Sequence, residues 1–170
     1  MRKHKIKMIA LLIVLVMLVG GCFSAVGDES FLPEEDYFIV TLSVRVDTLL
    51  GSMNILDREK HELVPDDGMI FPATDVRAVE GDSVFDVLQR EMRHAGIHLA
   101  FRVTPFIDSA YVEAINNIYE FDAGELSGWK YIVNSEFPGI SSSQYYLSPG
   151  DIIEWVYSID LGRDIGAGSW

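Results

Sequence analysis

Aromatic side chains crowd the last third of this chain, and they are the residues best suited to contact a ligand. They are Trp129, Tyr131, Phe137, Tyr145, Tyr146, Trp155 and Tyr157. Flat rings with polar tips suit a large ligand that contains an apolar ring of its own. The alternative is that these rings fill the core of a sheet, because strands favour aromatic residues whatever the function. This alternative applies to Trp129 and Trp155 in particular, which lie in predicted strands and could serve as core residues instead of ligand contacts.

The loop from 137 to 145 holds stronger candidates for ligand contacts than the strands do, because turn-borne aromatic residues are seldom needed for packing. The candidates in this loop are Phe137, Ile140, Ser141 and Tyr145. A small-molecule site predicts a concave pocket lined by Trp129 and this loop. A protein-interaction module, the alternative function, predicts a flat exposed apolar patch instead.

The histidines and acidic residues that could bind a metal are not arranged to do so. His94 and His98 have helical spacing, but Gly96 between them is expected to end the helix, so the two imidazoles diverge and we predict no metal site. Asp160 and Asp164 have no EF-hand spacing, and we interpret them as parts of a surface turn with an Asp–Arg pair. A calcium-stabilised adhesion element is the alternative, and it predicts that chelation lowers the melting temperature.

Residues for nucleophilic catalysis form no recognisable motif. The sequence contains no Gly-x-Ser-x-Gly elbow, and one of its four histidines, His4, lies in the signal-like amino-terminal segment. Paired carboxylates for glycoside chemistry depend on folding rather than on spacing, so the sequence leaves them open. We predict that the protein is not an enzyme, has no catalytic residues and requires no cofactor.

The first 22 residues have the order of a secretory signal. Four basic residues precede an unbroken apolar run of 11 residues from Ile9 to Val19, and Gly20-Gly21-Cys22 follows. The run is shorter than the roughly 18 residues that span a bilayer. The segment resembles a bacterial lipobox, in which Cys22 is acylated after cleavage, and several acyl chains together anchor a protein stably. Release after cleavage and an uncleaved anchor are the alternatives.

Composition restricts the partners of the part that follows the signal. Residues 22–170 hold nine Lys and Arg against 26 Asp and Glu, a formal charge of −17. Such a chain repels a phosphate backbone, so we predict no nucleic-acid partner. Cys22 is the only cysteine, so the domain has no internal disulfide and no thiolate metal site.

Alternation of apolar and polar residues predicts the strands. The clearest strand runs from Phe38 to Val46, with Val40, Leu42 and Val44 among the residues on its apolar face. Short helical pieces, including 57–63, and a turn ending at Gly68 form an insertion on the first hairpin. Further strands are expected at 75–80, 98–104, 111–119, 129–134 and 152–158.

Helical periodicity predicts one main helix from Val84 to Ala95. Ser83 and Asp86 form a capping-box pattern at its start, and Gly96 supplies the left-handed residue at its end. The expected fold is α+β: a mixed sheet of β-grasp type packed on one helix. We divide the chain into a signal peptide (1–21), a flexible tether (22–36), one domain (37–166) and a tail (167–170).

Three segments together resemble a known family: GDSVFDVLQREMRHAGI, YEFDAGELSGWKYIVN and YYLSPGDIIEWVYSIDLGRDIG. They are similar to a bacterial lipoprotein family of unknown function with a transcobalamin C-terminal-like domain, of the soluble ligand-binding β-grasp class. The similarity runs from about Tyr37 to Gly166. Its most specific elements are Gly128-Trp129-x-Tyr131-x-Val133-Asn134 and the Gly150-Asp151 turn before an apolar strand with a tryptophan.

The resemblance implies a ligand and its contacts. In transcobalamin and intrinsic factor the corresponding domain covers one face of cobalamin, so the expected ligand is cobalamin or another corrinoid, delivered to a membrane transporter. The implied contact residues are Trp129, Tyr131, Asn134, Phe137, Ile140, Ser141 and Tyr145. The expected location is the extracytoplasmic face of the cell membrane, with the lipid on Cys22 as the anchor.

Overall fold

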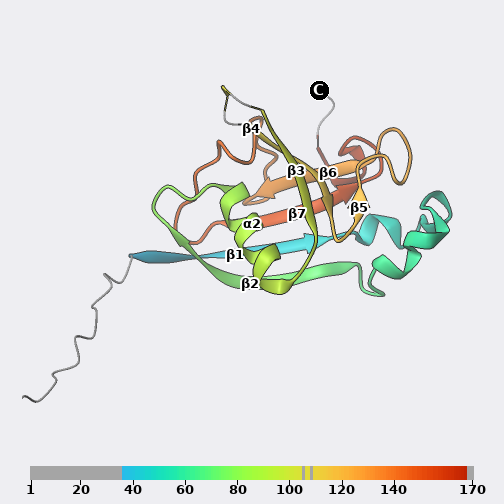
Figure 1. Ribbon diagram of the computed structural model, residues 1–170, viewed down its shortest axis with the longest axis horizontal. Helices are drawn as coiled ribbons and strands as arrows, with labels where there is room; N and C mark the ends of the chain where they lie inside the picture. Colours follow the sequence, from blue (N-terminus) through green and yellow to red (C-terminus); the bar gives the residue numbers. More distant parts are fainter. Residues whose placement is uncertain (1–35, 105, 108, 168–170) are drawn as a thin grey trace, which may run out of the picture. The chain divides into compact units, whose positions relative to one another are not determined.

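The computed structural model describes residues 36–104, 106, 107 and 109–167 (Figure 1). The predicted signal peptide, Cys22 and the tether up to residue 35 lie outside this range, as do the last three residues of the predicted tail. Within the described range, no helix is both long and apolar enough to cross a membrane.

Strands dominate the described domain, with one α-helix and several short 3-10 helices. In chain order the elements are β1 (Tyr37–Arg45), η1 (Asp47–Leu49), η2 (Met53–Ile55), η3 (Arg58–Leu63), β2 (Met69–Val79), α2 (Val84–Ala95), β3 (Leu99–Thr104), β4 (Ser109–Ile115), β5 (Ile118–Tyr119), β6 (Gly128–Val133), β7 (Ile152–Ser158) and η4 (Arg163–Ile165). The predicted α+β class is confirmed.

The larger sheet has four strands in the order β2-β1-β7-β6. β1 pairs antiparallel with β2 and parallel with β7, and β7 pairs antiparallel with β6, so the sheet is mixed as predicted. The predicted apolar face of β1 is buried, with Val40, Leu42 and Val44 at most 1% exposed. This face forms the centre of the core.

The second sheet has three strands in the order β3-β4-β5 and was not expected from the sequence. We predicted one strand over 111–119, but Asn116 and Asn117 divide it into β4 and β5. Both have positive φ angles, 52° and 60°, as the central residues of a tight hairpin turn require. Asparagine tolerates this conformation better than most residues, so the chain reverses there instead of continuing.

The helix α2 has the predicted limits and caps. The Ser83 side chain accepts a hydrogen bond from the Asp86 amide, and the Asp86 carboxylate accepts one from the Ser83 amide at 2.9 Å. Gly96 ends the helix with φ 68°. The helix contacts β2 of one sheet and β3 of the other, where the ring of Phe85 packs edge-on against Phe101 with centroids 4.8 Å apart.

The insertion between β1 and β2 consists of the three helices η1, η2 and η3, as predicted. It returns to the sheet through Gly68, whose carbonyl accepts a hydrogen bond from the Val46 amide at 2.7 Å. A Cβ atom at Gly68 would lie 2.6 Å from Cα of Asp47. Only glycine therefore fits where the insertion closes.

We expect Gly68→Ala to destabilise the domain more than Gly81→Ala does. Both glycines have positive φ, 73° and 89°, but a Cβ at Gly81 meets no atom within 4 Å. The left-handed backbone costs about 1–2 kcal/mol in either variant. The clash with Asp47 adds about 1–3 kcal/mol in Gly68→Ala alone. Urea unfolding of both variants measures the difference, and equal losses would show that the close approach is unimportant.

Candidate functional site

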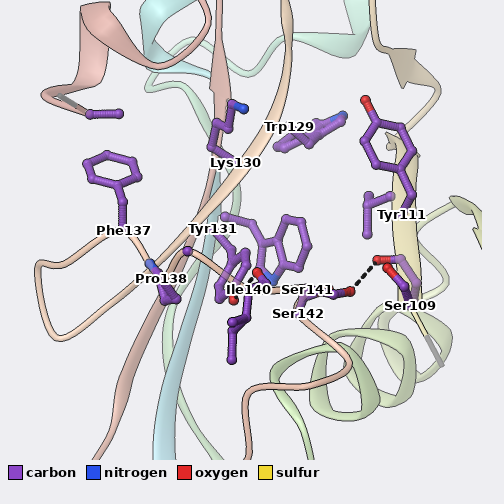
Figure 2. Close-up of a pocket in the computed structure, with 15 residues that line it drawn as sticks. Ser109, Tyr111, Trp129, Lys130, Tyr131, Phe137, Pro138, Ile140, Ser141 and Ser142 are labelled. Atoms are coloured by element: carbon purple, nitrogen blue, oxygen red, sulfur yellow. Dashed lines mark hydrogen bonds between the residues drawn. The ribbon is translucent and has the colours of Figure 1, made fainter. Parts of the chain in front are cut away.

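A pocket of about 450 Å³ lies between the two sheets and the loop that follows β6 (Figure 2). This volume falls in the range of small-molecule sites. Its wall comprises Ser109, Ala110, Tyr111, Val112, Trp129, Lys130, Tyr131, Phe137, Pro138, Gly139, Ile140, Ser141, Ser142, Trp155 and Ala167. Strands β4, β6 and β7, one loop and Ala167, two residues after the end of η4, thus meet at one place.

Five of the seven predicted contact residues line this pocket. They are Trp129, Tyr131, Phe137, Ile140 and Ser141. Figure 2 shows Phe137 on the loop and Trp129 on the side of the pocket that faces Tyr111. The structure therefore brings the tryptophan strand and the following loop together, although nothing in their spacing required it.

The other two predicted residues, Asn134 and Tyr145, lie outside the wall of the pocket. The side-chain nitrogen of Asn134 donates to the Asp151 carboxylate at 2.8 Å, and its side-chain oxygen accepts from the Ile152 main-chain amide at 3.0 Å. Asn134 thereby joins the end of β6 to the start of β7. The ring of Tyr145 packs edge-on against Tyr131 with centroids 6.4 Å apart, so Tyr145 supports a wall residue from behind.

Trp129 belongs to the core and to the pocket at once. It is 7% exposed, and its indole nitrogen donates to the Ile118 carbonyl on β5 at 2.9 Å. Its ring packs edge-on against Tyr157, with centroids 5.3 Å apart. The Tyr157 hydroxyl in turn donates to the Tyr119 carbonyl at 2.7 Å. The Trp129 side chain is therefore both a core residue and part of the pocket wall, so the two alternatives considered for it hold together.

Tyr131 connects the sheet to the loop. Its ring stacks at a tilt of 33° on Trp155, its partner on β7, and its hydroxyl donates to the Ile140 carbonyl at 2.9 Å. Burial, helped by the nearby Tyr145 hydroxyl, raises the pKa of Tyr131 to about 12. The phenol therefore stays protonated in mildly alkaline solution as well as at neutral pH, and its hydroxyl continues to hold the loop.

The indole nitrogen of Trp155 is buried and has no hydrogen-bond partner within the described residues. The residue is 3% exposed and lines the pocket. An unpaired buried N–H is unfavourable, and such groups usually find a partner.

Hydrogen bonds from serines fix the loop 137–143 against β4 and α2. The Ser141 hydroxyl donates to the Ala110 carbonyl at 3.1 Å, and the Ala110 amide donates to the Ser143 hydroxyl at 2.9 Å. The Ser142 carbonyl accepts from the Phe85 amide at 3.1 Å. Sequence reasoning missed the β4 part of the wall, since its pattern signals only a strand. It also missed Ala167, which was assigned to the tail and is buried.

No group of three or more His, Cys, Asp or Glu side chains among the described residues could hold a metal ion. Gly96 separates His94 from His98, as predicted, and His94 is largely exposed. The predicted Asp–Arg pair is present, with the Arg163 guanidinium donating to the Asp160 carboxylate at 3.1 Å. That hydrogen bond holds the pKa of Asp160 below its usual value.

Comparison with solved structures identifies the fold. The described domain shares its fold with part of haptocorrin, solved in complex with Cbi: TM-score 0.52, 14% identity, 73% of this chain and 25% of that chain. The chain thus spans a quarter of the length of that protein. The predicted transcobalamin-like fold is confirmed.

A second comparison covers part of the chain. Residues 81–158, just under half of the chain, are similar to the family described as Domain of unknown function (DUF4430). A putative metal binding protein from Ruminococcus gnavus is also similar, with TM-score 0.43 and 12% identity over 71% of this chain and 96% of that chain. A search of curated proteins found no match.

We expect Trp129→Phe to destabilise the domain more than Trp155→Phe does. Both changes remove similar buried volume, but only the first leaves a buried carbonyl, that of Ile118, without its donor. The unsatisfied carbonyl costs about 1–3 kcal/mol. Urea unfolding measures the two losses. A larger loss in Trp155→Phe would mean that the indole of Trp129 does not hold the sheets together.

Proposed function

We propose that this protein is a non-enzymatic, membrane-anchored binding protein of the extracytoplasmic face, and that its pocket takes one side of a corrinoid or a similar flat ring ligand. The observation that carries the proposal is the concave pocket lined by Trp129, Tyr131 and the 137–142 loop. Aromatic walls with a few fixed polar groups are typical of sites for partly apolar ligands.

The fold comparison supports the choice of ligand class. Haptocorrin was solved with Cbi, a corrinoid, and part of it shares the fold of this chain. Fold alone does not determine function, so the corrinoid rests on analogy and the pocket on the residues themselves. The pocket also favours a small molecule over a flat interaction or adhesion surface, because its wall is concave and continuous.

The lipid anchor and the transporter complete the proposal. The signal-like segment that ends at Cys22 supports anchoring, and a ligand captured outside the cell needs a membrane transporter to enter it. The strongly acidic composition argues against nucleic acid as a partner.

We expect the full chain without residues 1–21 to bind cobalamin or a corrinoid precursor in isothermal titration calorimetry. Phe137→Ala should weaken binding by about tenfold or more, as truncation of an aromatic contact at the centre of a site typically does. Tyr146→Ala is the matched control, because Tyr146 is 65% exposed and does not line the pocket. Absence of heat with every corrinoid at high micromolar concentration would reject the corrinoid.

We expect cells that express the protein to incorporate labelled palmitate into it, because Cys22 occupies the acylation position of the signal. The Cys22→Ala variant should carry no label. Equal labelling of the two proteins, or none in the wild type, would contradict the anchor while leaving the ligand untouched.

A further inference from the structure

Strand β6 is an edge of the larger sheet. It pairs with β7 on one side and, in the part of the chain that the structure describes, with no strand on the other. The pocket lies along this open side, since three consecutive residues of β6, from Trp129 to Tyr131, line it. A row of unpaired main-chain groups at an edge is a template for another strand.

The register of β6 and β7 identifies the unpaired groups. The main-chain amide of Asn134 donates to the Ile152 carbonyl. The residues of β6 that form hydrogen-bonded pairs with β7 are therefore every second residue before it: Ile132, Lys130 and Gly128. The amide and carbonyl groups of Trp129 and Tyr131 therefore point away from β7. Those of Val133 also point outward, but they bond to Glu136 in the turn. Among the described residues, the main chains of Trp129 and Tyr131 thus leave two donors and two acceptors without a partner, and both residues line the pocket.

The opposite wall of the pocket holds a second strand edge, that of β4, which serine hydroxyls occupy at Ala110. The main chain of Ala110 on β4 bonds to the hydroxyls of Ser141 and Ser143, so it points away from β3. Val112, two residues further on, points the same way and lines the pocket. β5 covers β4 only from Ala114 onward. Two strand edges therefore face the same cavity.

We propose that an extended peptide segment of a partner protein binds in this pocket by adding a strand to β6. Its main chain would pair with Trp129 and Tyr131, and alternate apolar side chains would enter the pocket beside Phe137. Strand addition of this kind takes its affinity from main-chain hydrogen bonds and its specificity from pockets for alternate side chains.

The pocket wall holds Lys130 and no Asp or Glu, so it is the net charge of the whole domain that favours basic residues at the ends of such a segment, beyond the wall. From residue 36 onward the chain holds 22 Asp and Glu against nine Lys and Arg. Complementary charge speeds association and excludes acidic partners. The inference goes beyond the proposed function, and a peptide in the pocket would exclude a ring ligand, so a partner segment could displace that ligand.

The probe is an acetylated and amidated peptide of the pattern Lys-Val-Thr-Val-Thr-Val-Lys, titrated against the chain without residues 1–21. We expect a dissociation constant below about 1 mM. We also expect the peptide to slow hydrogen exchange of the Trp129 and Tyr131 main-chain amides, measured by nuclear magnetic resonance. A peptide with Glu in place of both Lys residues should bind several-fold more weakly. No binding of either peptide at that concentration would overturn the inference.

N-methylated peptides separate main-chain pairing from side-chain contact. Methylation of every second amide keeps all side chains but removes the donors of one edge, so one of the two alternately methylated peptides should bind at least about tenfold more weakly than the other. Equal affinity of both methylated peptides and the parent would overturn strand addition.

The protein variants Tyr131→Pro and Tyr131→Ala give the complementary test. Both remove the ring, but only proline removes the outward N–H, which the β6–β7 ladder does not use. We expect peptide affinity to fall further in Tyr131→Pro, whereas corrinoid affinity falls equally in both. Corrinoid binding without peptide binding would reject this inference alone, and the reverse would reject the proposed ligand alone.

Discussion

Two buried side-chain donors hold the second sheet against the first, and the pocket depends on them. Trp129 on β6 donates to Ile118, and Tyr157 on β7 donates to Tyr119, so neighbouring strands of one sheet bind the same short strand, β5, of the other. The Trp129 bond is buried and the Tyr157 bond is partly buried, and a donor without its acceptor is costly in such places. The two sheets are therefore fixed relative to each other at β5.

The pocket exists because that connection is short. β5 has two residues, and beyond it β4 and β6 run without a strand between them. The loop after β6 closes only part of the opening. Its Ser141 hydroxyl donates to Ala110 of β4, and its Ile140 carbonyl accepts from the Tyr131 hydroxyl. What stays open is a space with aromatic rings on its wall and the main chains of two strands, β4 and β6, along its sides.

Local signals predicted much of the fold. The Ser83–Asp86 capping box and Gly96 set both ends of α2, and alternation alone identified the buried face of β1 and the limits of β7. These patterns depend on neighbours in the sequence, so they are visible without the fold. The turn at Asn116 was overlooked although its signal was present, because the apolar alternation continues across it. As a result, one predicted strand became two, and one predicted sheet became two.

The candidate site divides in the same way. The sequence by itself determined that aromatic residues cluster in 129–157, and the resemblance selected Trp129 and the following loop. Only the tertiary structure decided that Val112 of β4 and Ala167 share a wall with them, that Asn134 serves a turn instead, and that the indole nitrogen of Trp155 has no hydrogen-bond partner among the described residues. The physical reason is that a pocket is defined by the space left between elements, and that space depends on long-range sheet packing that no local pattern encodes.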